Sequence, residues 1–285
     1  MTDIEITGQH RCFGGTVSFV RHRAAATGTD MAFAVYVPPQ ADSGPVPVLT
    51  YLAGLTCTEE TFMIKAGAQR MAAELGLMLV TPDTSPRGEG VPDDPDGAFD
   101  FGLGAGFYID ATAAPWSRHY RMESYVTRDL RDAVFANFPG DRDRQGIFGH
   151  SMGGHGALTL ALKHPEIYRS LSAFAPIVAP TQCPWGEKAF ANYLGPDRDA
   201  WAAHDATGLM RAGGDASARP EILIDQGLAD QFLERELHPH LFEAACKDAG
   251  QALTLRRHEG YDHGYYFIST FIEDHLRHHA GILKG

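Results

Sequence analysis

Ser151 lies in the stretch 149–153, which reads Gly-His-Ser-Met-Gly and has the pattern G-x-S-x-G. This pattern is typical of a nucleophilic serine on a sharp turn between a strand and a helix. The glycines are needed because the turn leaves no room for side chains beside the serine. A short apolar stretch (145–148) precedes the motif, and a small, apolar stretch (153–163) follows it. The sequence therefore predicts that Ser151 is a catalytic nucleophile on a strand-turn-helix element.

A serine nucleophile needs a histidine that accepts its proton, and this histidine is expected after the last strand of such a chain. His258 and His263 both follow the apolar stretch 253–257. His263 stands among the turn residues Gly-Tyr-Asp-His-Gly (260–264), whereas His258 is next to the strand. We therefore assign the base to His263. The competing interpretation is a surface or helix-capping histidine, which we expect for most of the fourteen histidines.

The histidine needs a carboxylate that orients it, expected after the seventh strand. Asp225 ends the predicted strand 221–225, and Asp230 follows five residues later, beyond Gly227. Because the chain can turn at Gly227, we assign the acid to Asp230 and expect Asp225 to brace the loop. Asp262 is ranked third, since neighbouring residues of an extended loop point in different directions.

Acyl transfer also requires two hydrogen-bond donors that stabilise the negative charge developing on the carbonyl oxygen. We expect them to be the backbone N–H of Met152 and the backbone N–H of Leu55, in the loop 53–56 after the third strand. Cys57 follows this loop and lies near the expected acyl pocket. A buried thiol is a simpler interpretation of Cys57 than a nucleophile. His150 and His155 flank the serine turn, and core packing is the default interpretation of both.

The segments around these residues alternate strands and helices, which predicts an α/β-hydrolase fold in a single domain, residues 1–285. We expect a mostly parallel sheet of eight strands with helices on both faces. The predicted strands are 16–22, 31–37, 46–52, 77–81, 145–148, 169–174, 221–225 and 253–257, the first two antiparallel. The predicted helices run from Thr58 or Thr61 to Leu75 and over 124–138, 153–163, 232–248 and 265–279.

Two long segments interrupt this alternation. Residues 83–119 are rich in proline, glycine and aromatic residues, and we expect them to cover part of the site. Residues 176–220 form a second excursion, which contains Trp185. Trp185 is a candidate for the wall of the acyl pocket.

The composition limits the partners of the chain. Its 285 residues are 44% hydrophobic, and 24 Lys and Arg against 36 Asp and Glu give a formal charge of −12, which argues against nucleic acid or an anionic membrane as a partner. We expect a cytoplasmic protein with free thiols, because there is no leader-like N-terminus, no long apolar span and no C-x-x-C pair. We expect neither a metal nor a cofactor, since no ligand or nucleotide-binding motif is present.

The sequence resembles the S-formylglutathione hydrolase (esterase D) family over nearly its whole length. The segments that carry the resemblance are Leu52 to Glu59, Thr81 to Gly88, Gly104 to Tyr108, Gly149 to Ala157, Asp225 to Leu233 and Gly260 to Phe267. The chain departs from the family in two places: Ala53 and Gly264 stand where serine is usual. We expect these departures to affect rate and selectivity rather than the class of reaction.

The resemblance implies hydrolysis of S-formylglutathione to glutathione and formate, a step of glutathione-dependent formaldehyde removal. It assigns Ser151 as nucleophile, Asp230 as acid and His263 as base, with Leu55 and Met152 as oxyanion donors. It implies that Cys57 corresponds to the family's cysteine near the active site. This cysteine is linked to sensitivity toward thiol reagents, although it is not the nucleophile. It also implies a homodimer.

Two other functions remain as alternatives from the sequence. One is a broad carboxylesterase that uses the same residues on small acyl esters. The other is a catalytically silent binding protein on the same fold. The groups that would hold the glutathione carboxylates are not evident: Lys65 and Arg87 lie near the site motifs, but solvated surface charge is the simpler interpretation of each.

Overall fold

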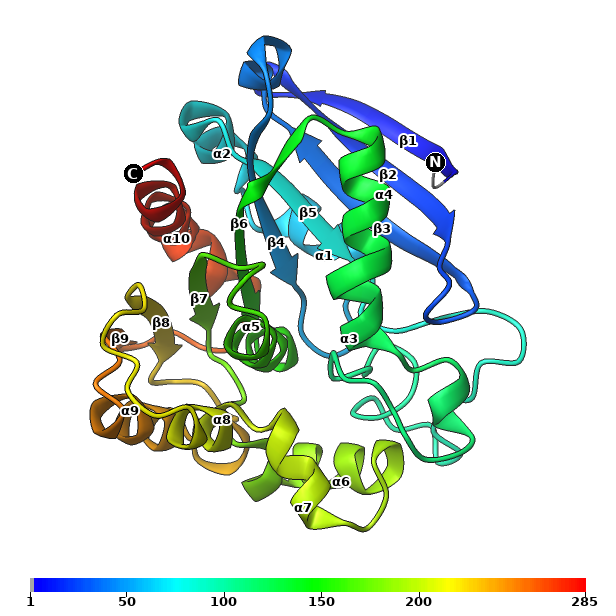
Figure 1. The fold of residues 1–285 in the computed structure, drawn as a ribbon, viewed down its shortest axis with the longest axis vertical. Coiled ribbons are helices and arrows are strands. Elements are labelled where there is room, and N and C mark those ends of the chain that lie inside the picture. Colours follow the sequence, from blue (N-terminus) through cyan, green and yellow to red (C-terminus); the bar gives the residue numbers. More distant parts are fainter. Residues whose placement is uncertain (1–2) are drawn as a thin grey trace.

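A single sheet organises the computed structural model, which describes residues 3–285 (Figure 1). Over these residues the sheet has nine strands in the order β1-β2-β3-β5-β4-β6-β7-β8-β9. Strands β1, β2, β3 and β5 pair antiparallel in that order, and all pairs from β5 to β9 are parallel. The strands are β1 Ile4–Cys12, β2 Gly15–Arg23, β3 Asp30–Val37, β4 Val46–Leu52, β5 Met78–Pro82, β6 Gly140–His150, β7 Ser170–Phe174, β8 Ile222–Gly227 and β9 Leu253–His258.

The parallel strands form the centre of the core. Every residue of β4, β5, β7 and β8 is buried, because these strands are covered on both faces. Their carboxyl ends meet at one edge of the sheet. This edge therefore brings together the residues that follow β4, β6, β8 and β9.

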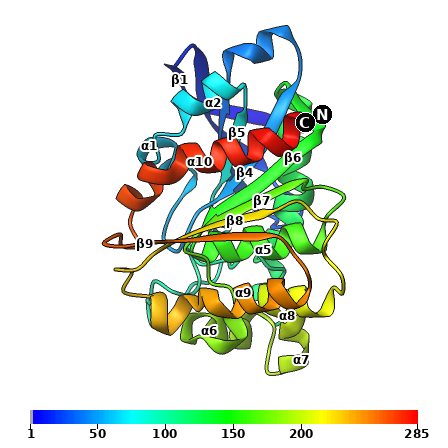
Figure 2. The ribbon, with the colours of Figure 1, turned by 90° about the vertical axis from the view of Figure 1, so that its left-hand side faces the viewer.

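Helices cover both faces of the sheet, as expected, and Figure 2 shows the two layers from the side. Helices α1, α2 and α10 lie on one face, and α4, α5, α8 and α9 on the other. The helices are α1 Glu59–Lys65, α2 Gln69–Leu75, α3 Met122–Ser124, α4 Leu130–Asn137, α5 Met152–Lys163, α6 Pro184–Tyr193, α7 Arg198–Trp201, α8 Ala206–Ala212, α9 Pro239–Asp248 and α10 Tyr265–Lys284. Within residues 3–285 no helix is long and apolar enough to cross a membrane.

The expected number of eight strands is wrong, because β1 was not predicted. This strand reads Ile-Glu-Ile-Thr-Gly-Gln-His-Arg-Cys, and most of its residues are exposed. Its side chains bury too little apolar surface to give the alternation that marks a strand in sequence. Its pairing with β2 across the turn at Phe13 and Gly14 makes it an edge strand instead.

Two predicted helices are also broken. The helix expected to end at Leu75 is divided into α1 and α2, since Gly67 has a φ of 68°, outside the helical region. The helix expected over 232–248 consists of a π-helical turn, Leu233–Leu237, followed by α9. His238 separates the two with a φ of 50°, and Pro239 starts α9.

The two excursions are well packed. Residues 83–119 are irregular except for one short 3-10 turn, yet they bury Phe101, Trp116 and nearby Tyr120, which contact Tyr193 of α6. The second excursion, 176–220, contains α6, α7 and α8, which were not predicted. Figure 1 places α6 and α7 beyond the carboxyl ends of the strands, where they help to cover that edge.

Candidate active site

Ser151 occupies the turn between β6 and α5. Its backbone has φ 57° and ψ −118°, a conformation that costs free energy for any residue except glycine. The surrounding backbone holds it there, because Ser151 N–H donates to the Phe174 carbonyl at 3.0 Å and the Ser151 carbonyl accepts from His155 N–H at 3.0 Å. The strained turn directs the Ser151 side chain away from the sheet, toward the edge where the carboxyl ends of the strands meet.

The two glycines of the motif permit direct contact between backbones. A Cβ on Gly153 would lie 1.9 Å from the carbonyl oxygen of Leu52, and a Cβ on Gly149 would lie 2.2 Å from the carbonyl oxygen of Gly153. Helix α5 therefore packs against the end of β4 with no side chain between them. This contact fixes the distance between the nucleophile and the loop that follows β4.

That loop approaches Ser151 directly. The position of a Cβ on Gly54 is 3.3 Å from the Cβ of Ser151, so a side chain there would crowd Ser151. Within residues 3–285 the backbone N–H groups of Leu55 and Met152 donate to no protein acceptor. The Met152 N–H is free because it belongs to the first turn of α5. Both groups are available to a negatively charged oxygen beside Ser151.

His263 and Asp230 form a close pair next to the serine. His263 Nδ1 donates to Asp230 Oδ2 at 2.5 Å, which leaves Nε2 as the nitrogen with a free lone pair. The Asp230 carboxylate is buried, and it also accepts from the N–H of Phe232 at 2.8 Å and from Gln226 Nε2 at 3.2 Å. His263 and Ser151 line the same cavity. The arrangement can orient the imidazole of His263 toward the cavity that Ser151 lines.

Backbone contacts also join the loop of the acid to the loop of the histidine. Ala229 N–H donates to the Tyr261 carbonyl at 2.9 Å, and Leu228 N–H donates to the His258 carbonyl at 2.9 Å. A Cβ on Gly227 would lie 2.4 Å from the Tyr261 carbonyl oxygen. Gly227 therefore allows the turn after β8 and also the close approach of the two loops.

The other candidates from sequence lie elsewhere. Asp225 accepts hydrogen bonds from Arg256, and its Oδ2 lies 3.2 Å from His275 Nε2, away from His263. His258 stacks on Phe271 with a ring distance of 3.9 Å. Asp262 accepts from the N–H of Gly264 at 2.9 Å. None of these three side chains lines the cavity of Ser151.

Aromatic side chains close the cavity, whose volume is about 270 Å³. Trp185 contacts Phe232 at a ring distance of 4.7 Å and Phe99 at 6.0 Å, and Phe232 also meets His263 at 5.0 Å. Trp185 therefore lies in the wall of this cavity. The cavity is lined by Gly54, Leu55, Thr56, Cys57, Phe99, His150, Ser151, Trp185, Phe232, His263 and Tyr265.

Several residues that shape the site were missed in the sequence. Gln226 donates to the acid, and it could have been found because it adjoins Asp225 in a matched family segment. Glu236 accepts from the Trp185 N–H at 3.0 Å and so holds the start of α6. Phe232 and Tyr265 also lie in matched family segments, two residues after Asp230 and His263, whereas Phe99 belongs to the irregular segment 83–119 and reaches the cavity through long-range packing.

Two further residues of the cavity, Cys57 and His150, are buried groups, and burial shifts the pKa of each. Burial raises the pKa of the Cys57 thiol, so the thiol stays protonated at neutral pH, which does not favour a nucleophile. His150 is fully enclosed, and both its ring nitrogens lack a hydrogen-bond partner among the described residues. Its ring lies 4.4 Å from that of His263. Burial, with the neighbouring His263, lowers the pKa of His150 well below its usual value.

Comparisons with known proteins identify the family of the chain. A family model described as "Putative esterase" matches residues 24–278. The S-formylglutathione hydrolase of Paracoccus denitrificans (strain Pd 1222) is 55% identical over 276 residues, which cover 97% of each chain. The enzyme of the same name from Mus musculus is 54% identical over 277 residues, again 97% of each chain. The chain belongs to the S-formylglutathione hydrolase family.

A solved member of the S-formylglutathione hydrolase family has the same fold. The structure of the enzyme from Agrobacterium tumefaciens superposes with a TM-score of 0.94 at 54% identity, covering 98% of this chain and 99% of that chain. The α/β-hydrolase class expected from sequence is therefore correct.

The two departures from the family pattern have different surroundings. Ala53 is fully buried, and its carbonyl accepts from Tyr108 Oη at 2.9 Å. Gly264 precedes α10 at the capping position and has no side chain to cap the helix. A serine there would offer a hydroxyl to the free N–H groups of the first turn. Gly264 therefore removes a helix cap one residue after His263.

Proposed function

We propose that this chain hydrolyses S-formylglutathione to glutathione and formate, as a step in the removal of formaldehyde through glutathione. The observation that carries the proposal is the cavity in which Ser151, the Asp230-paired His263 and the free N–H of Leu55 meet. Its volume of about 270 Å³ suits a small acyl group. The high identity to enzymes of that name supports the choice of substrate.

In the proposed first half-reaction, Ser151 Oγ attacks the formyl carbon while His263 Nε2 takes the hydroxyl proton. The oxyanion accepts hydrogen bonds from the N–H groups of Leu55 and Met152. The C–S bond then breaks, and the protonated His263 returns the proton to the sulfur, so glutathione leaves as a thiol. Asp230 holds His263 in the required tautomer and stabilises its cation.

In the second half-reaction, His263 takes a proton from water, and the resulting hydroxide attacks the formyl ester of Ser151. The same two N–H groups stabilise the new oxyanion. Collapse breaks the ester bond, His263 protonates Ser151 Oγ, and formic acid is released, which loses its proton to water and becomes formate at neutral pH. The cycle needs no group beyond these side chains, two amides and water.

Steady-state kinetics tests the proposal. Turnover of S-formylglutathione and of a short acyl ester is measured for the parent and for Ser151→Ala. We expect the parent to prefer the thioester in kcat/KM and Ser151→Ala to lose both activities. Equal preference for the two substrates would favour the broad carboxylesterase, and a parent without either activity would favour the silent binding protein.

We also propose one domain, a homodimer and a cytoplasmic location. The continuous sheet supports one domain, which limited proteolysis would test. The exposed side chains of Ile64 (68%) and Tyr266 (88%) offer apolar surface for a second copy. Sedimentation of the parent tests the dimer.

All four cysteines of the chain are unpaired, which suits a reducing compartment. Fractionation of cells tests the location.

A further inference from the structure

A shallow hollow of about 400 Å³ adjoins the cavity of Ser151. Phe232 and His263 line both spaces, so the hollow and the cavity share one wall. The loops after β8 and β9 supply the rest of the hollow. It is lined by Ala229, Gln231, Phe232, Asp262, His263 and Gly264. The proposed triad does not use the side chains of Gln231 and Asp262.

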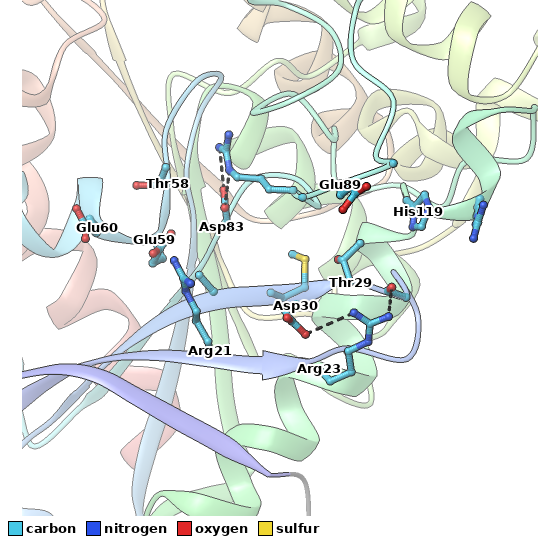
Figure 3. Close-up of a pocket in the computed structure, with 17 residues that line it drawn as sticks. Arg21, Arg23, Thr29, Asp30, Thr58, Glu59, Glu60, Asp83, Glu89 and His119 are labelled. Atoms are coloured by element: carbon cyan, nitrogen blue, oxygen red, sulfur yellow. Dashed lines mark hydrogen bonds and ion pairs between the residues drawn. The ribbon is translucent and has the colours of Figure 1, made fainter.

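A larger, charged cavity of about 820 Å³ lies farther from the serine (Figure 3). Figure 3 shows Arg21 extending from β2 toward Glu59 at the start of α1. This cavity shares no lining residue with the cavity of Ser151. Arg21 belongs to β2, four strand positions from β6, which corresponds to about 19 Å at a strand spacing of about 4.8 Å. A thiol bound at Ser151 therefore meets the hollow beside His263 before it could reach the charged cavity.

The chemistry of the proposed cycle determines on which side of the site the thiol leaves. His263 Nε2 takes the proton of Ser151 and then returns it to the sulfur of the leaving thiol. Proton transfer requires the two atoms to come within hydrogen-bond distance, so the sulfur lies beside the ring of His263. The rest of the thiol extends from that sulfur. It can enter the hollow, because His263 lines the hollow as well as the cavity.

Asp262 gives the hollow a free carboxylate oxygen. Among the residues that line the hollow it is the one with a carboxylate, and it is exposed. Its Oδ1 accepts from the Gly264 N–H at 2.9 Å, while its Oδ2 has no partner within residues 3–285. Gly264 has no side chain that could cover this carboxylate, since a Cβ there would lie 3.2 Å from Oδ1. The hollow therefore suits a positively charged group.

The γ-glutamyl arm of glutathione carries such a group and is long enough to place it there. From the cysteine sulfur to the γ-glutamyl ammonium the arm measures about 10 Å when extended. The carboxylate of Asp262 lies at most about 12 Å from His263 Nε2, because adjacent Cα atoms are about 3.8 Å apart and each side chain adds only its own length. An ion pair spans a further distance of about 2.8 Å. An arm whose sulfur is beside His263 can thus reach Asp262.

We propose that the hollow beside His263 binds the γ-glutamyl arm of the leaving glutathione, an inference that rests on the proposed function. The ammonium group of the arm lies against Asp262, and the amide of Gln231 donates to the carboxylate of the same arm. The formyl carbon stays in the cavity of Ser151. The cavity therefore selects the acyl group, and the hollow selects the thiol. Because Asp262 is exposed, the ion pair favours an ammonium-bearing thiol by only about 2- to 5-fold.

The test compares S-formylglutathione with its N-acetyl derivative, in which the ammonium group is replaced by a neutral amide. The two substrates carry the same formyl group and the same thiol, so a change in the chemical step cancels in the ratio of their kcat/KM values. We expect the parent to prefer S-formylglutathione by about 2- to 5-fold and Asp262→Asn to lose most of this preference. The amide oxygen of this variant can still accept from the Gly264 N–H. Asp262→Lys should invert the preference, and Asp262→Glu should restore it.

Asp42→Asn is the matched control, because Asp42 is an exposed aspartate that precedes β4, lies outside the hollow and has no partner within residues 3–285. It removes the same charge and should keep the ratio of the parent. If the parent hydrolyses S-formylglutathione but Asp262→Asn and Asp262→Lys behave like the control, the hollow does not bind the arm and the proposed function stands. A parent that does not hydrolyse S-formylglutathione overturns the function and this inference together.

Discussion

Over residues 3–285 two Ser-His-Asp arrangements lie at neighbouring strands, and the one that we propose for catalysis opens into a cavity. In the second, Ser172 Oγ is 2.8 Å from His275 Nδ1, and His275 Nε2 is 3.2 Å from Asp225 Oδ2. These residues come from β7, α10 and β8. The first arrangement, Ser151, His263 and Asp230, comes from the loops at the edge of the same sheet.

The two arrangements differ in their access to solvent and in whether any hydrogen-bonding group is left without a partner. Ser172, His275 and Asp225 are completely enclosed. Ser172 also bonds His279 Nε2 at 2.8 Å, and Asp225 is held by Arg256. Burial lowers the pKa of His275. The second arrangement thus has no free donor, no free acceptor and no room for a carbonyl group. Residue types and hydrogen bonds alone do not make an active site.

Exchanging the two serines for alanine gives the largest contrast. We expect Ser151→Ala to lower kcat for S-formylglutathione by about 10⁵-fold, because the nucleophile is lost. Ser172→Ala should keep kcat within about 3-fold but lower the free energy of unfolding by about 1–3 kcal/mol, since two buried histidines lose a partner. Kinetics and urea unfolding measure the two effects. A folded Ser172→Ala protein without turnover would contradict the comparison.

Substitutions of Asp230 and Asp225 should also have different effects, the first on turnover and the second on stability. We expect Asp230→Asn to lower kcat by about 10³- to 10⁴-fold, because His263 loses the carboxylate that fixes its tautomer, with little change in the melting temperature. Asp225→Asn should lower the free energy of unfolding by about 3 kcal/mol, because Arg256 and His275 lose their common partner. The idea fails if Asp225→Asn melts like the parent.

The enclosed histidines predict how stability depends on pH. Burial holds the pKa of His279 well below its usual 6.5. Below pH 6.5 the unfolded chain therefore takes up a proton that the folded chain does not, and stability is lost as the pH falls from 6.5 toward the folded pKa. We expect His279→Asn to reduce this slope by up to about 1.4 kcal/mol per pH unit. Unfolding at several pH values measures it, with Ser151→Ala as a control that keeps the parent slope.

The smallest effect is expected at Cys57, whose thiol lies in the accessible site but lacks a base. Because burial raises the pKa of this thiol, it is protonated at neutral pH, and Cys57→Ser should keep kcat within about 3-fold. Steady-state kinetics on S-formylglutathione checks it. A loss as large as that of Ser151→Ala would give the thiol a part in acyl transfer.

The local features of the site could be predicted from the sequence. The turn at Ser151 depends on glycines two residues away. Asp230 is favoured over Asp225 by a turn at Gly227, where the structure has the close approach to Tyr261. In both cases the physical cause lies within a few residues. The central strands were also predicted, because burial on both faces leaves a continuous apolar run.

Features that depend on distant segments could not be predicted. Strand β1 is polar and exists through its pairing with β2. Trp185 reaches the cavity because Glu236, 51 residues away, holds the start of α6. Each of these depends on contacts that only the complete fold creates.

The direct backbone contact of Gly153 with Leu52 has a consequence for how this scaffold can change. Because no side chain separates the serine turn from the oxyanion loop, ordinary substitutions cannot adjust the spacing of attacking oxygen and stabilising amides. New acyl preferences are therefore expected to come from the aromatic wall of Phe99, Trp185 and Phe232, which three different segments supply. Selectivity can diverge while the reacting geometry is inherited as one rigid unit.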